Sequence, residues 1–244
     1  WSWRFAAWLA DERWFNSRFV WKTWEAERPR TGSRLVAPLS KPPTATFPPE
    51  ARTGFVFLGR LVPGKGVDVL LSAYTQARLD PIRWPLTIVG DGPLRASLEQ
   101  RWNTRASRGV RFKGFLAGEA KNRALAGAKW LVAPSNCDEG FGLIAVEARH
   151  AGVPCVITRD GGLPEAAGRD ALVCEPGDVE GLCDLLRVAA TMSEAEYRRR
   201  SIRTAQDLAD DIVPTSFYSD AYMRLVGTRA GCDGVRRTDE SRMG

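Results

Sequence analysis

Short, wholly apolar runs alternate with amphipathic stretches from Gly54 onward. The apolar runs lie at 55–58, 86–89, 110–112, 130–133, 155–157 and 171–173, and stretches of helical periodicity lie at 67–79, 93–105, 118–126, 143–151 and 178–190. Strands that lack polar alternation are buried on both faces, and helices between them favour a parallel sheet. The pattern therefore predicts an α/β fold, a Rossmann-like, doubly wound parallel sheet, over residues 51–212.

A different pattern precedes this region. Residues 1–30 contain six of the nine tryptophans, and the seven-residue spacings of Trp1 with Trp8 and of Trp14 with Trp21 put each pair on one face of a helix. Such a helix either docks on a membrane surface or a partner, or packs at a domain interface. Prolines crowd residues 38–50, which we interpret as a linker, so 1–50 is an aromatic-rich segment plus linker.

The chain after the α/β region has two further parts. A charged helix is expected at 194–210, and an apolar stripe predicts a C-terminal helix within 213–227. The end of the chain contains Gly227, Gly231 and Gly234, together with scattered charges and few apolar groups. This composition predicts a disordered tail over 228–244.

The composition excludes several classes of protein but does not identify a function. The 244 residues are 44% hydrophobic and 26% charged, which excludes a disordered or collagen-like chain. No apolar run is long enough to cross a bilayer. Five cysteines without a C-x-x-C pair, and one histidine, do not make a Cys/His zinc site and favour reduced cytoplasmic thiols. A net charge of +6 favours anionic ligands, acidic lipid surfaces or nucleic acid alike. The initial Trp suggests that the sequence begins inside a longer protein or after removal of a leader.

A phosphate-binding pattern follows the first strand of the predicted sheet. Residues 59–65 read G-x-x-x-x-G-K, but Gly66 stands where a P-loop needs a Ser or Thr hydroxyl to hold magnesium. Arg60 and Lys65 instead place two cations at the carboxyl end of a strand and near a helix N-terminus. This arrangement can hold a diphosphate without a metal, whereas the alternative is a turn with ordinary surface cations.

Two more glycine-rich loops follow predicted strands. In the first, Glu139 and Glu147 flank a turn whose Gly140 and Gly142 leave backbone N–H groups accessible to an anionic or hydroxyl-rich ligand. The alternative is a solvated pair of glutamates. The second loop, residues 160–165, has consecutive glycines before a proline. Ligands of parallel sheets bind outside the carboxyl ends of the strands, so all three loops are expected at one site.

Several short motifs occur in order along residues 54–190. They are Gly59-Arg60 with Lys65-Gly66, then VGDGP at 89–93, FKG at 112–114, APS at 133–135, EGFGL at 139–143 continuing to EA at 147–148, GVP at 152–154 and GGLPE at 161–165. This set resembles the motifs of the family 4 retaining glycosyltransferases. The resemblance implies a GT-B fold of two facing Rossmann-like domains, of which this chain supplies the C-terminal, nucleotide-sugar-binding half.

The resemblance also implies roles for individual residues. Arg60 and Lys65 would grip the donor diphosphate, Glu139 would lie by the sugar hydroxyls, and Glu147 would hold the ribose. Residues 112–115 would line the base pocket. The implied catalytic residues are Glu139, Arg60 and Lys65, and the implied donor-binding residues are Gly59, Arg60, Lys65, Lys113, Glu139, Gly140, Phe141, Gly142, Leu143 and Glu147.

The implied function is transfer of a sugar, with retention of configuration, from a nucleoside-diphosphate sugar to an unidentified saccharide, lipid or small molecule. Neither a metal nor a cofactor nor nucleic acid is expected, and the expected location is the cytoplasm, with or without peripheral membrane contact. Residues 16–19 resemble the end of an N-terminal acceptor domain that is otherwise missing. The alternatives are a non-catalytic nucleotide-sugar sensor or scaffold and a P-loop-like phosphohydrolase.

Overall fold

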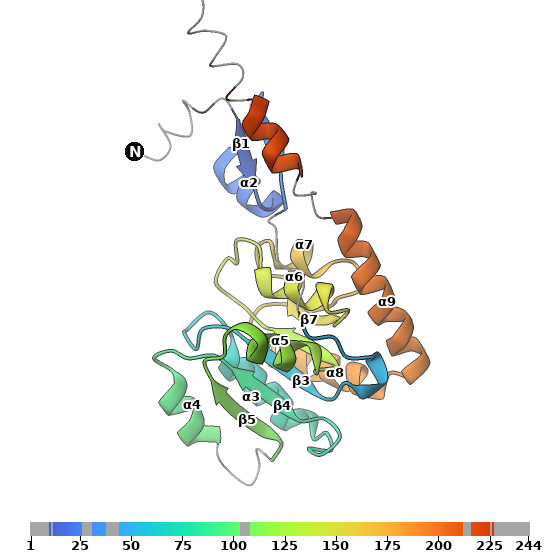
Figure 1. Ribbon diagram of the computed structural model, residues 1–244. Helices are drawn as coiled ribbons and strands as arrows, with labels where there is room; N and C mark the ends of the chain where they lie inside the picture. Colours follow the sequence, from blue (N-terminus) through green and yellow to red (C-terminus); the bar gives the residue numbers. More distant parts are fainter. Residues whose placement is uncertain are drawn as a thin grey trace, which may run out of the picture.

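A parallel sheet forms the centre of the molecule (Figure 1). The computed structural model describes residues 10, 12–25, 31–37, 44–102, 108–211, 216–224 and 226. Within these residues the large sheet has the strand order β5-β4-β3-β6-β7-β8, and every pairing is parallel. Its strands are β3 (Phe55–Leu58), β4 (Leu86–Val89), β5 (Val110–Gly114), β6 (Trp130–Ala133), β7 (Cys155–Thr158) and β8 (Leu172–Cys174).

Helices cover both faces of this sheet. One face packs on α3 (Val67–Ala77), α4 (Arg95–Trp102) and α8 (Val179–Thr191), and the other packs on α5 (Gly118–Ala126), α6 (Leu143–His150) and α7 (Leu163–Ala167). Successive residues of β3 alternate between the two cores, since Phe55 and Phe57 face the first and Val56 and Leu58 the second. Burial on both sides explains why β3 and β6 are apolar throughout, whereas β5 at the edge of the sheet carries the exposed Arg111 and Lys113.

The doubly wound α/β prediction is confirmed. The strands at 55–58, 86–89 and 130–133 have the predicted bounds, and β8 is shifted by one residue. The helix expected at 93–105 covers Arg95–Trp102, and residues 103–107 lie outside the described part. The helix α7 has only five residues, and Pro164 lies in its first turn, as its position after the double glycine suggests.

The aromatic-rich segment is a small βαβ unit rather than one long helix. It consists of β1 (Arg13–Phe15), α2 (Arg18–Glu25) and β2 (Ser33–Leu35), with β1 and β2 parallel. The prediction that Trp14 and Trp21 share a helix face is therefore wrong, because Trp14 lies in β1 and Trp21 in α2. Trp1, Trp3 and Trp8 lie outside the described residues.

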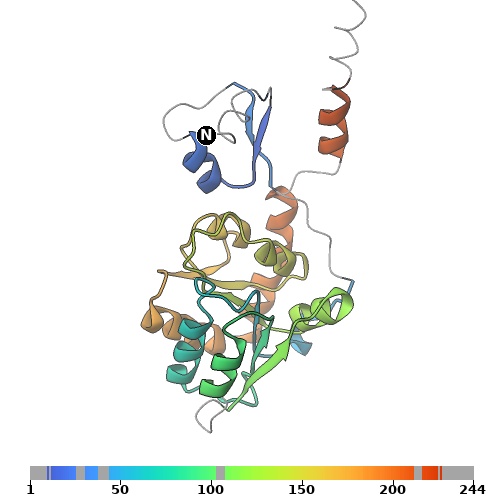
Figure 2. The ribbon, with the colours of Figure 1, turned by 90° about the vertical axis from the view of Figure 1, so that its left-hand side faces the viewer.

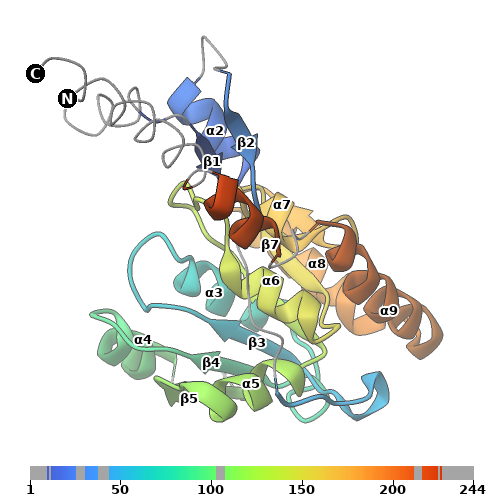
Figure 3. The ribbon, with the colours of Figure 1, turned by 45° about the horizontal axis from the view of Figure 1, so that its top comes forward.

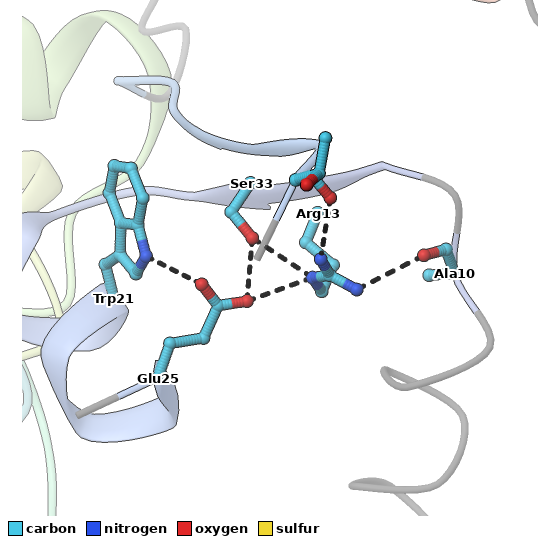
Figure 4. Close-up of polar contacts among 6 residues, drawn as sticks. Ala10, Arg13, Trp21, Glu25 and Ser33 are labelled. Carbon is cyan, nitrogen blue, oxygen red and sulfur yellow. Dashed lines mark hydrogen bonds and ion pairs between the residues drawn. The ribbon is translucent and has the colours of Figure 1, made fainter. Parts of the chain in front are cut away.

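A polar cluster inside this unit explains why the chain folds back on itself (Figure 4). The Glu25 carboxylate accepts hydrogen bonds from Trp21 Nε1 at 2.9 Å, Ser33 Oγ at 2.7 Å and Arg13 Nε at 3.0 Å. These donors come from α2, β2 and β1, so one buried carboxylate joins all three elements. Trp21 also stacks on Phe15 at 5.8 Å, so this indole serves internal packing.

The last described residues return to the N-terminal unit. After α9 (Glu194–Asp211), residues 216–224 are helical and lie beside β1 (Figure 3). Trp14 contacts the rings of Phe217 and Tyr218 there, at 5.5 and 5.6 Å. Figure 2 shows this unit next to one end of the sheet domain. None of the helices in the described part combines the length and apolar character needed to cross a bilayer.

Candidate functional site

Three loops meet at the carboxyl edge of the sheet, around the point where the strand order reverses between β3 and β6. The β3–α3 and β6–α6 loops are joined there by the hydrogen bond from Asn136 N to Gly64 O, at 2.8 Å. The β7–α7 turn is joined to the β6–α6 loop by the bond from Gly162 N to Glu139 O, at 2.7 Å. The convergence expected from the sequence is therefore present, and this reversal point is where ligands of open α/β sheets bind.

Gly66 shows why the first loop is not a P-loop. Its backbone is left-handed (φ 66°), and a Cβ built on it would lie 1.9 Å from Pro134 O. A Ser or Thr at this position would clash with the backbone at the end of β6. The loop thus lacks both the magnesium-binding hydroxyl and the room for one, which argues against the phosphohydrolase alternative.

The two predicted cations of this loop have different surroundings. Lys65 Nζ forms an ion pair with Glu139 Oε2, and both side chains are partly buried. Ser135 Oγ lies 3.4 Å from the same carboxylate oxygen. Arg60 is exposed and forms no ion pair with a residue in the described ranges. The site therefore has one cation already balanced by the predicted sugar-binding carboxylate and one that is available to an anion.

A thiol that was not predicted also belongs to this site. Cys137 is exposed and packs against Gly64, because a Cβ on Gly64 would lie 2.7 Å from Cys137 Cβ. Desolvation by the surrounding loops raises the pKa of the Cys137 thiol, while the nearby Lys65 acts in the opposite direction. The neutral thiol is favoured at this position.

The EGFGL segment presents backbone donors toward the same edge. Gly142 precedes α6 in a left-handed conformation (φ 99°), and Phe141 is buried whereas Leu143 is half exposed. Within the described part of the chain, no oxygen accepts a hydrogen bond from the N–H groups of residues 140–143. Unpaired N–H groups at the start of a helix attract phosphate and hydroxyl oxygens.

The second predicted carboxylate, Glu147, is one and a half turns further along α6. It pairs with Lys121 of α5 at 2.7 Å, so Glu139 and Glu147 meet lysines from different elements. Lys113 is exposed in β5, the outer strand, two strands away from β3. Among the described residues, Lys113 forms no hydrogen bond or ion pair with the Lys65–Glu139 pair, and the neighbouring Phe115 ring is 73% exposed.

Three residues outside the predicted set shape this site. Ser17 Oγ donates to Gly140 O at 2.6 Å, and the Glu165 carboxylate accepts from Arg18 N at 2.9 Å, so the start of α2 docks on two of the three loops. Asp160 accepts hydrogen bonds from the β6–α6 loop. A Ser before an amphipathic stretch signals a helix N-cap, and Asp160 directly precedes the double glycine, but neither signal predicts the partner.

The fold defines the class of the protein as a Rossmann-like α/β domain with its ligand edge at a sheet reversal point. The chain belongs to the Glycosyl transferases group 1 family, whose model matches residues 52–190, more than half of the chain. Its sheet has the Rossmann-like fold of GT-B glycosyltransferase structures, which confirms the expected fold class, and the family model confirms the expected membership among the glycosyltransferases.

Individual relatives agree with this assignment. Glycogen synthase of Mycobacterium tuberculosis H37Rv is 36% identical over 166 residues, which cover 66% of this chain and 40% of that protein. A GDP-mannose-dependent monoacylated α-(1-6)-phosphatidylinositol monomannoside mannosyltransferase of Corynebacterium glutamicum is 35% identical over 134 residues, 52% of this chain and 35% of its own length. The chain thus spans less than half the length of these curated relatives.

Solved structures show the same fold at low sequence identity. HepE from Anabaena, crystallised with UDP and glucose, superposes with a TM-score of 0.73 over 89% of this chain and 63% of its own. The two are 18% identical, so this likeness supports the fold alone.

Proposed function

We propose that this chain binds a nucleoside-diphosphate sugar at the carboxyl edge of its sheet and supplies the donor side of a glycosyl transfer that retains anomeric configuration. The observation that supports this most is the meeting of Lys65, Glu139 and the unpaired N–H groups of residues 140–143 across the β3–β6 reversal point. A donor has a diphosphate for the cations and hydroxyls for the carboxylate. The mannosyltransferase relative named above is GDP-mannose-dependent.

Binding begins with the exchange of one ion pair for another. In the free chain Lys65 is paired with Glu139, and the donor diphosphate competes for the lysine together with Arg60. Glu139 is then released to accept hydrogen bonds from sugar hydroxyls, while Glu147 faces the ribose. Two cations and a helix start neutralise the diphosphate, so we propose that no metal is needed.

In the transfer step the bond between the anomeric carbon and the diphosphate oxygen breaks, and a bond to the acceptor oxygen forms on the same face of the sugar. A donor phosphate oxygen takes the acceptor proton. The nucleoside diphosphate leaves with the electron pair of the broken bond. Arg60, Lys65 and the start of α6 stabilise the charge that develops on it. The acceptor is a saccharide, a lipid or a small molecule.

Calorimetric titration with UDP, GDP, UDP-glucose and GDP-mannose tests this proposal. We expect binding of one base series to persist in excess EDTA and to weaken by about 1.5 to 3 kcal/mol in Lys65→Ala and in Arg60→Ala. Arg198→Ala, which removes an exposed cation of α9 paired with Glu50, is the matched control and should bind normally. Loss of binding on chelation would instead favour a metal-dependent phosphate site.

A further inference from the structure

Asp160 is a buried carboxylate that the β6–α6 loop wraps around. The residue is 6% exposed and lies two positions after β7. Its oxygens accept hydrogen bonds from three consecutive backbone N–H groups, those of Cys137 at 3.1 Å, Asp138 at 3.0 Å and Glu139 at 3.2 Å. Consecutive N–H groups form a concave anion site, and here the chain fills that site with its own carboxylate.

The conformation of the β6–α6 loop depends on the Asp160 carboxylate that occupies this anion site. Asp138 has a left-handed backbone (φ 54°), which is uncommon for a residue other than glycine. The hydrogen bond to a charged acceptor offsets the strain of that conformation, since such bonds are stronger than neutral ones. Without the carboxylate, three N–H groups at the ligand edge would lose their acceptor together.

The turn after Asp160 holds the other backbone polar group of Glu139. Gly162 N donates to Glu139 O at 2.7 Å, so both backbone polar groups of Glu139 bond to residues 160–162. Gly161 has φ 53°, and a Cβ there would lie 2.1 Å from Glu139 O. The backbone of Glu139 is therefore fixed from both ends while its side chain faces Lys65.

The geometry points to Asp160 as a positioning residue that sets the Glu139 side chain for the donor sugar. This inference rests on the proposed function, because it assigns the sugar to the Glu139 loop. Asp160 acts through the backbone and does not touch the donor. An asparagine cannot replace it fully, since its NH₂ group would face N–H groups where the second carboxylate oxygen accepts.

Asp160→Asn is the first variant to measure, with two readouts. Hydrogen exchange of the free protein should show that the amides of residues 137–139 lose protection. Affinity for UDP-glucose or GDP-mannose, whichever the wild type binds, should fall about tenfold, with the matching free diphosphate changed less than about threefold. If Asp160 has only a structural role, the variant should lose affinity for both ligands equally. That result would overturn the proposed positioning role.

A double-variant cycle tests whether Asp160 acts through Glu139. In a Glu139→Gln background, Asp160→Asn should reduce donor affinity by less than about twofold further, because coupled residues are non-additive. Full additivity of the two effects would overturn the inference. Asp178→Asn is the matched control, since Asp178 caps α8 through Gly181 N at 2.8 Å and should alter neither loop exchange nor binding.

A second variant and a ligand-free measurement distinguish failure of the Asp160 inference from failure of the proposed function. If Asp160→Asn fails to fold, Gly161→Ala is the second variant. It perturbs the backbone of Glu139 at its carbonyl group and should, in the same way, weaken binding of the sugar-bearing ligand selectively. If the wild type binds no nucleotide sugar, the proposed function fails, and hydrogen exchange alone decides on Asp160. Unchanged protection of residues 137–139 in Asp160→Asn would then refute its hold on the loop.

Discussion

For Glu139 and Glu147, the sequence predicts the element on which each residue lies but not the residue with which it pairs. Their spacing of eight places one in a loop and the other on α6, as the sequence suggested. Each is paired with a lysine of another element, Lys65 or Lys121, and neither pairing follows from spacing. Such pairs form because the topology brings the β3–α3 loop beside the β6–α6 loop and α5 within reach of α6.

The two carboxylates are expected to divide the donor between them. Glu147→Gln should weaken binding of the free nucleoside diphosphate, because that ligand contains the ribose, whereas Glu139→Gln should spare it and weaken only the intact donor. Calorimetry with both ligands measures the split. Equal losses for both ligands in either variant would show that the two side chains have been assigned to the wrong ends of the donor.

The buried thiol of Cys155 links single residues to the pH dependence of stability. Burial raises its pKa from 9.0 to about 12, so the folded state retains a proton that the unfolded state releases. This contribution is complete below pH 9 and is lost as the pH rises toward 12. Between pH 8 and 10 the free energy of unfolding should fall by about 1 kcal/mol from this group. Urea unfolding of Cys155→Ala should show a correspondingly shallower decline.

At the scale of helices and strands, the longer and more deeply buried elements are the ones that the sequence predicts correctly. The inner strands of the large sheet are predicted almost residue by residue because burial on both faces makes them almost wholly apolar. The βαβ unit at the N-terminus was missed because β1 and β2 have three residues each, too few to show alternation. The cluster around Glu25 that holds it together depends on residues 12 and 20 positions from Arg13, which periodicity does not detect.

Arg52 joins elements whose mutual packing the sequence did not indicate. Its buried guanidinium donates to Ala151 O at 2.6 Å, to Gly152 O at 2.5 Å and to Ser201 Oγ of α9 at 3.2 Å. Arg52→Met should lower the free energy of unfolding by about 2 to 4 kcal/mol, because it leaves buried acceptors unpaired. In urea titrations, Arg198→Met, which breaks an exposed pair, should change it by less than about 1 kcal/mol.

At the scale of the molecule, the sheet order explains why the three loops could be assigned to one site before their contacts were known. The carboxyl ends of parallel strands lie at the same edge of a sheet. Loops that follow these strands therefore meet there, even when they are far apart in the sequence and their side-chain contacts are not known. The docking of α2 through Ser17 and Glu165 could not be foreseen, because it joins residues more than 120 positions apart. It places the N-terminal βαβ unit directly on the proposed donor site.

Donor binding and sugar transfer are expected to be separable in this chain. Transfer requires the acceptor oxygen to be held about 3 to 3.5 Å from the anomeric carbon, and one Rossmann-like sheet offers one ligand edge. The chain covers 35% to 40% of the curated relatives described above. We therefore expect residues 1–244 to bind the donor yet to transfer its sugar far more slowly than the roughly 1 per second typical of enzymes. A transfer assay over saccharide, lipid and small-molecule acceptors, run on protein whose donor binding has been measured, checks this. Turnover at or above that rate would show that the acceptor side is complete within this chain.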